Sequence, residues 1–156
     1  MTELIFNVYG EPIPQGSTRA FIPKGWTRPI ITADNKKTKP WRQEIAGAAL
    51  QAMEHDLLDC AGKDVPFRVA ITFRFQKPKS TKKTVLEKVT KPDTDKLIRA
   101  VLDALTGIVW TDDSQVVEIH ARKEFGIQPG AKIMIWELGE IPVGVAVKPE
   151  WLQIPF

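Results

Sequence analysis

The sequence predicts an α+β fold, in which a mixed β-sheet has helices packed on one side of a single domain. Residues 67–75 alternate strictly between apolar and other side chains, which is the pattern of a strand with one buried face. Two segments, 40–55 and 93–106, have apolar residues at the spacing of an amphipathic helix. These helices alternate with strands along the chain and no repeat is visible, which favours one domain over residues 1–156.

The N-terminal third combines a strand with a basic hairpin. Residues 3–9 alternate as a strand does, and residues 12–32 are rich in proline, glycine and basic side chains. Short pieces at 20–22 and 29–32 can pair there as a hairpin. The first helix then begins near Pro40, because proline suits the first helical turn, and it runs to about residue 55.

The C-terminal half supplies the remaining elements. Residues 76–91 contain few apolar residues and many lysines, so we expect a mobile loop before the second helix, which Gly107 ends. Residues 115–125 and 132–138 are predicted to form a β-hairpin with its turn at 128–130. The segment 140–156 contains several prolines and is expected to be an irregular tail.

Composition excludes several classes of protein. Cys60 is the single cysteine, which rules out an internal disulfide framework and a four-cysteine zinc site. The N-terminus lacks the basic flank and apolar run of a signal peptide, and no stretch approaches the roughly 20 apolar residues of a membrane span. We therefore expect a soluble, cytoplasmic protein without a membrane partner.

The net charge is only +3, but the basic residues are concentrated in residues 15–42 and 74–99. Two basic segments on a nearly neutral chain indicate a face that binds a polyanion. Solvated loops would give the same pattern, so charge alone leaves both interpretations open. The candidate phosphate contacts are Lys77, Lys79, Lys82, Lys83 and Lys91 in the second segment and Arg19, Lys24 and Arg28 in the hairpin.

Four aspartates flank the second helix. Asp93 and Asp95 lie where a loop enters it, and Asp112 and Asp113 follow it. Magnesium prefers hard oxygen ligands and keeps several waters, so two or three converging carboxylates are enough to hold it. Helix capping and turn formation explain each aspartate singly, but the four together, beside a lysine-rich loop, favour a metal site. Such a site requires the segment after the helix to return to the helix start.

Asp95, Arg99 and Asp103 are spaced by four residues and line one face of the predicted helix. One interpretation is an exposed ladder of ion pairs. The other places Arg99 beside the metal site, where its guanidinium binds the scissile phosphate. Trp26 in the basic hairpin also has two interpretations, since it can pack in the hairpin or stack on an unpaired base.

The sequence resembles the RusA family of Holliday-junction resolvases in the segment around the second helix. The family has Asp-x-Asp-Asn at a helix start, then Asp-Ala-Leu, then Trp-x-Asp-Asp-x-Gln-Val. The matching residues here are 93–96, 103–105 and 110–116, within a close match over about 91–117. Two positions depart from the family pattern. Lys96 replaces an asparagine, and Arg99 replaces a lysine that is more readily deprotonated.

The resemblance implies a RusA-like fold and a homodimer that makes paired nicks in a four-way junction with Mg²⁺, with Mn²⁺ as an alternative ion. It implies that Asp93, Asp95 and Asp113 are the metal ligands, that Arg99 takes the position of a catalytic lysine, and that Asp112 is a further acid at the site. The expected function is therefore magnesium-dependent junction resolution in DNA recombination and repair. Rival interpretations are a nuclease that prefers flaps or forks and a catalytically silent protein that binds branched DNA.

Overall fold

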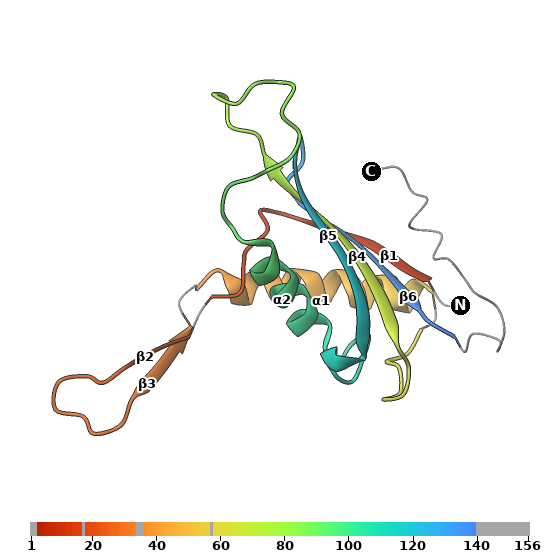
Figure 1. Ribbon diagram of the computed structural model, residues 1–156. Coiled ribbons are helices and arrows are strands. Elements are labelled where there is room, and N and C mark those ends of the chain that lie inside the picture. The colour runs from red at the N-terminus through yellow and green to blue at the C-terminus, as the bar shows by residue number, and fades with distance from the viewer. Residues whose placement is uncertain (1–2, 17, 34–35, 57, 140–156) are drawn as a thin grey trace.

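The computed structural model describes residues 3–16, 18–33, 36–56 and 58–139 (Figure 1). Its main sheet has four strands in the order β1-β6-β4-β5. These are β1 (Glu3–Tyr9), β6 (Gly130–Glu137), β4 (Phe67–Gln76) and β5 (Val116–Gly126). Strand β4 is parallel to β5 and antiparallel to β6, and β6 is antiparallel to β1. The sheet is therefore mixed, as the sequence predicts.

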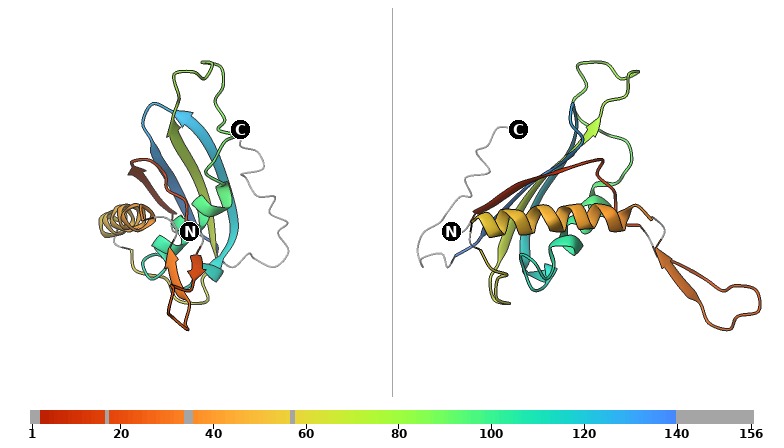
Figure 2. Two further views of the ribbon diagram at one scale, coloured as in Figure 1. Left: turned by 90° about the vertical axis from the view of Figure 1, so that its left-hand side faces the viewer. Right: turned by 180° about the vertical axis from the view of Figure 1, so that it is seen from behind.

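Two helices cover one face of this sheet, as Figure 2 shows. They are α1 (Thr38–His55), which contacts β1, and α2 (Thr94–Leu105), which contacts β5. Both were expected from their apolar spacing, and the α+β architecture with helices on one side is confirmed. No helix in the part of the chain that the structure describes is long and apolar enough to cross a membrane.

The core lies between the helices and the sheet, and β4 supplies its centre. Every second side chain of β4, from Phe67 to Phe75, is buried beneath the helices, while Arg68 and Arg74 lie on the opposite face. On that open face Arg68 pairs with Glu118 at 2.9 Å and Arg74 with Glu124 at 2.8 Å. Trp41 of α1 and Trp110 after α2 are also buried. The core side of β4 thus follows from the strict alternation of its sequence.

The predicted hairpin of residues 115–125 and 132–138 is wrong in its pairing. Both segments form strands, but β4 lies between β5 and β6, so the two are not bonded to each other. The linking residues 127–129 cross two strand spacings, about 9.6 Å, which four Cα steps can span. Strand β4 is central because a neighbouring strand along each of its edges then flanks its apolar residues on both sides.

A separate two-stranded ribbon projects from the body next to the N-terminal end of α1 (Figure 1). It consists of β2 (Thr18–Phe21) and β3 (Ile30–Ala33), which pair in antiparallel register. The predicted hairpin at 20–22 and 29–32 is thus confirmed, with bounds shifted by one or two residues. The predicted tail, residues 140–156, lies outside the described residues.

Candidate active site

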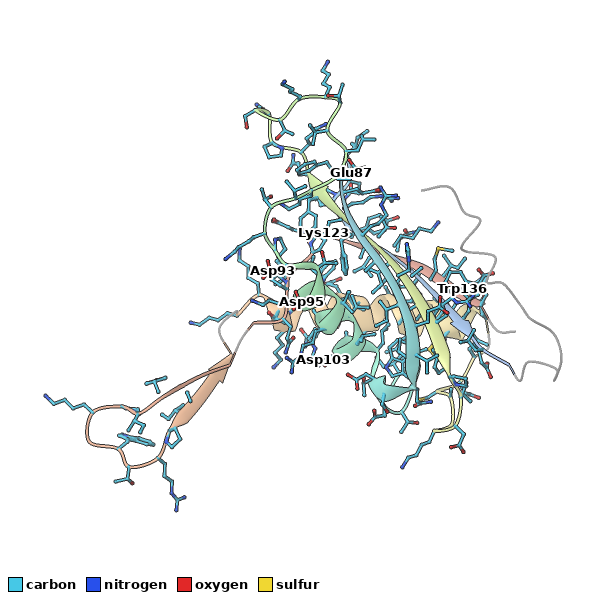
Figure 3. All side chains as sticks on the ribbon, in the orientation of Figure 1. Glu87, Asp93, Asp95, Asp103, Lys123 and Trp136 are labelled. Atoms are coloured by element: carbon cyan, nitrogen blue, oxygen red, sulfur yellow. The ribbon has the colours of Figure 1, made fainter. Side chains whose placement is uncertain are left out.

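The N-terminal end of α2 presents two carboxylates. Asp93 is the residue before the helix, with extended backbone at φ −70° and ψ 139°, yet its side chain accepts no capping hydrogen bond. Asp95 lies in the first turn, and both side chains are exposed. Figure 3 shows the two aspartates together at this end of the helix. Capping therefore does not account for Asp93, and the partial positive charge of a helix start favours both acids there.

Lys123 on β5 fixes the backbone that leads into Asp93. Its Nζ atom donates hydrogen bonds to the carbonyl oxygens of Thr90, at 2.9 Å, and Pro92, at 2.7 Å. It lies on the face of the sheet toward the helices, in register with the buried Phe73. Sequence reasoning missed Lys123. The signal was available, because a lysine on the helix-facing side of an alternating strand needs polar partners.

Arg99 lies one turn beyond Asp95 on an exposed part of α2. Within the described residues, Arg99 makes no ion pair or hydrogen bond, so the ladder with Asp95 and Asp103 does not form. Asp103 is instead held by Arg42 of α1, whose guanidinium lies 3.7 Å from the carboxylate and donates to the Asp103 carbonyl at 3.2 Å. Arg99 is thus available to an incoming anion.

The other two aspartates lie at the opposite end of α2. Helix α2 has 12 residues, a length of about 18 Å by its rise per residue. Asp93 is near Lys123, which lies late in β5. Asp113 lies three residues before the start of β5, whose first residue Val116 pairs with Phe67. Among the residues that the structure describes, no three His, Cys, Asp or Glu side chains are grouped closely enough to hold a metal ion. The expectation that the chain returns to the helix start is wrong within a single chain.

Asp112 and Asp113 differ in their surroundings. Asp112 caps the 3₁₀ helix η1 (Asp113–Gln115), since its carboxylate accepts a hydrogen bond from the Ser114 backbone at 2.9 Å. Gln115 completes the capping box and donates to the carbonyl oxygens of Gly62 and Val65. The hydrogen bonds from Ser114 lower the pKa of Asp112. Asp112 therefore has a structural role, whereas the exposed Asp113 carboxylate has no partner in the described part of the chain.

A basic cleft of about 500 Å³ lies beside the start of α2. Lys88 stands over the rings of Phe75 and Phe125, at 5.1 and 5.7 Å, and burial, followed by the charge of Lys123, lowers its pKa. Lys77 donates to the Lys83 carbonyl oxygen at 2.8 Å and so closes the loop on itself. The loop 77–91 also bonds to β5 through backbone groups of residues 86 and 88. The lysines that line this cleft are Lys77, Lys79, Lys88 and Lys91.

A second cleft, of about 740 Å³, lies between α1 and α2. Its cations are Lys36, Lys39 and Arg42, and its wall includes Gln15 and Asp103. The side-chain oxygen of Gln15 is buried there without a hydrogen-bond partner. The first basic segment contains these three cations, but sequence reasoning did not single them out, because only the packing of α1 against α2 creates the cleft.

The remaining predicted phosphate contacts lie on exposed segments. Lys24 and Arg28 are exposed near the tip of the ribbon. Lys82 and Lys83 are exposed on the loop 77–91, the lysine loop. The side chain of Arg19 lies outside the described residues. The structure therefore places the cations on three separate surfaces around the part of α2 that carries Asp93, Asp95 and Arg99. These surfaces are the ribbon tip, the lysine loop with its cleft, and the cleft between α1 and α2.

Comparisons with known proteins show the family of this chain. A family model described as the endodeoxyribonuclease RusA matches residues 10–136. The chain is 32% identical over 138 residues to the uncharacterized protein YqaN of Bacillus subtilis, covering 85% of this chain and 95% of that protein. It is 34% identical over 74 residues to a protein of Lactococcus phage r1t named crossover junction endodeoxyribonuclease rusA, covering 47% of this chain and 56% of that one. The chain belongs to the RusA endodeoxyribonuclease family.

Proposed function

We propose that this protein is a magnesium-dependent endonuclease that resolves four-way DNA junctions by paired nicks during recombination and repair. The observation that carries the proposal is the pair of exposed carboxylates, Asp93 and Asp95, at the start of α2. Asp93 makes no capping hydrogen bond and lies 3.6 Å from the Lys96 ammonium, Arg99 lies one turn beyond Asp95, and a lysine-lined cleft lies beside them. The name of the Lactococcus phage relative supports the junction as substrate.

The donor set at the start of α2 fits magnesium. Mg²⁺ is commonly bound by one or two carboxylates together with waters and substrate phosphate oxygens, and Asp93 and Asp95 offer such carboxylates on an exposed surface. The ion, when bound, lowers the pKa of a coordinated water and stabilises charge on the leaving oxygen. Mn²⁺ has similar ligand preferences and is expected to substitute.

The position of Asp113 favours a homodimer. If Asp113 contributes to a site with Asp93 and Asp95, it must come from a second copy, because the two groups lie at opposite ends of α2 in one chain. A two-fold axis beside α2 brings the end of one helix to the start of the other. The two resulting sites are equivalent, which suits two symmetrical cuts in a four-way junction.

The remaining residues act on the DNA backbone. Arg99, with its planar guanidinium, neutralises charge that develops on the scissile phosphate, and Lys91 lies at the edge of the same surface. The lysines of loop 77–91 and the cations Lys36 and Lys39 hold flanking phosphates. Such contacts provide affinity that depends on salt and little reading of sequence. Lys123 positions Asp93 without touching DNA.

Cleavage of a labelled four-way junction tests the proposal, with linear duplex and flap DNA as controls and with or without Mg²⁺. We expect symmetrical nicks in the junction that require the metal. Equal cutting of the flap would indicate a flap- or fork-preferring nuclease. Specific junction binding without cutting in Mg²⁺, or in Mn²⁺ added in its place, would indicate the catalytically silent protein. The absence of a three-acid group among the described residues of one chain favours that alternative.

A further inference from the structure

The tip of the β2–β3 ribbon exposes large apolar side chains that the core does not use. Phe21, Ile22 and Trp26 are 50%, 62% and 61% exposed, although they lie within six residues of one another. The ribbon stands apart from the sheet and helices in Figure 1 and in the right-hand view of Figure 2. Exposed apolar groups gathered in this way indicate a surface that a partner covers.

A tight turn holds Trp26 at the corner of the tip. The backbone N–H of Trp26 donates to the carbonyl oxygen of Pro23 at 3.0 Å, and Gly25 between them has φ +90°. This is the geometry of a turn that requires positive φ at its third residue, which glycine adopts without strain. The indole is therefore presented to solvent from a defined backbone rather than from an extended loop.

The charges of the ribbon identify the kind of partner. Residues 18–33 include Arg19, Lys24 and Arg28 and no acidic residue. Aromatic rings interleaved with cations are the combination that binds nucleic acid where bases are accessible, since the rings stack on bases while the cations contact phosphates. A protein partner with an apolar surface would leave the cations unpaired.

The root of the ribbon is tied to the candidate active site. The backbone N–H of Gln15 donates to the carbonyl oxygen of Lys96 at 2.9 Å, in the first turn of α2 beside Asp93 and Asp95. The tip itself lies away from these acids (Figure 3). DNA that is bound at the acids and also reaches the ribbon would therefore meet the tip at a part other than the phosphate that is cut.

We propose that the ribbon tip inserts Trp26, supported by Phe21 and Ile22, against bases that lose their stacking neighbours at the branch point, while Lys24 and Arg28 contact the adjacent phosphates. The tip selects branched over linear DNA because an intact duplex offers it no open base face. This inference rests on the proposed function, since it requires branched DNA as the ligand.

The test uses a four-way junction with the fluorescent base 2-aminopurine at the crossing, with chelator present so that DNA is not cut. We expect the native chain to change the fluorescence at the crossing but not at a position within an arm. Trp26→Ala should lose this change and bind the junction about 5- to 150-fold more weakly, the range for loss of one stacked base, with duplex affinity unchanged. Trp26→Phe should restore part of both.

Ile127→Ala is the matched control, because Ile127 is a fully exposed apolar residue outside the ribbon and both basic clefts. If Trp26→Ala leaves junction affinity and fluorescence unchanged, this inference is overturned and the proposed function is not. An equal loss of duplex affinity would also overturn it and make the tip a general DNA contact. A fall in oligomer mass for Trp26→Ala would show that a second copy covers the tip. No junction binding by the native chain would overturn the proposed function itself.

Discussion

The Nζ atom of Lys123 lies 2.7 Å from the carbonyl oxygen of Pro92, so β5 holds the chain directly before Asp93. This bond and its companion to Thr90 anchor the loop at the point where it becomes helix α2. A cation that bonds two carbonyl oxygens satisfies polar groups that would otherwise lose hydrogen bonds on packing. The position of Asp93 therefore depends on a residue thirty positions later in the chain.

Lys123→Met should lower both stability and cleavage. Loss of a charged donor to two carbonyl oxygens is expected to reduce the free energy of unfolding by about 1.5–3 kcal/mol, and the freed loop should no longer hold Asp93 in place. Denaturant unfolding and single-turnover cleavage measure the two effects. Lys132→Met is the control, because Lys132 lies on the opposite face of the sheet. A cleavage rate equal to that of the control would contradict the positioning role.

Asp95→Asn should abolish cutting and leave junction binding equal or tighter. The substitution removes a carboxylate from the proposed metal site and also removes repulsion toward phosphate. Gel-shift affinity and single-turnover cleavage in Mg²⁺ measure this separation. Asp64→Asn, at an exposed aspartate before β4, is the matched control and should behave like the native chain. Normal cutting by Asp95→Asn would remove Asp95 from the mechanism.

Replacement of Lys82 and Lys83 by alanine should have the reverse effect. Both side chains are exposed on the lysine loop, away from the acids. Fewer counterions are released when the variant binds, so affinity falls and the dependence of log K on log salt becomes shallower. Cleavage at saturating protein should be largely retained. Binding like that of the native chain across a salt series would contradict a phosphate contact by this loop.

Mixing two inactive variants tests whether the site is shared between copies. In a dimer of Asp95→Asn with Asp113→Asn, shared sites leave one centre with both native aspartates and the other with neither. The mixture should then nick one strand of a junction, while each variant alone cuts nothing. Sites formed within one chain would give no activity in the mixture. Strand-resolved product analysis after co-refolding distinguishes the two results.

Asp112 should affect stability in a manner that depends on pH. The hydrogen bonds from Ser114 hold its pKa below the ordinary value of 3.8, so the carboxylate stabilises the fold above that value, and the contribution is lost as pH falls through the lowered pKa. Asp112→Ala should therefore reduce the thermal midpoint at neutral pH, and the difference from the native chain should shrink in acid. Asp113→Asn should leave the midpoint unchanged at every pH. Parallel pH profiles for Asp112→Ala and the native chain would contradict the capping role.

The sequence predicts those parts of the fold that depend on local pattern. The strict alternation around Ile71 identifies β4, and the apolar spacing after Pro92 identifies α2. The order of strands does not follow from such patterns, because the insertion of β4 between β5 and β6 depends on contacts between distant segments.

The same limit applies to the candidate site. The aspartates are recognisable from their spacing and from the family resemblance. Whether Asp113 lies close to Asp93 in the folded chain depends on where β5 starts relative to α2. Local sequence carries no information on that point. The role of Lys123 also becomes visible only when β5 lies beside the loop before α2.

The separation of the two acidic groups by the length of α2 has a consequence for DNA geometry. In the proposed dimer the two α2 helices run antiparallel, and each cutting centre combines the start of one with the end of the other. The centres are then spaced by about one helix length, about 18 Å for 12 residues. In that proposed dimer the number of turns in α2 would set the distance between the two strand breaks.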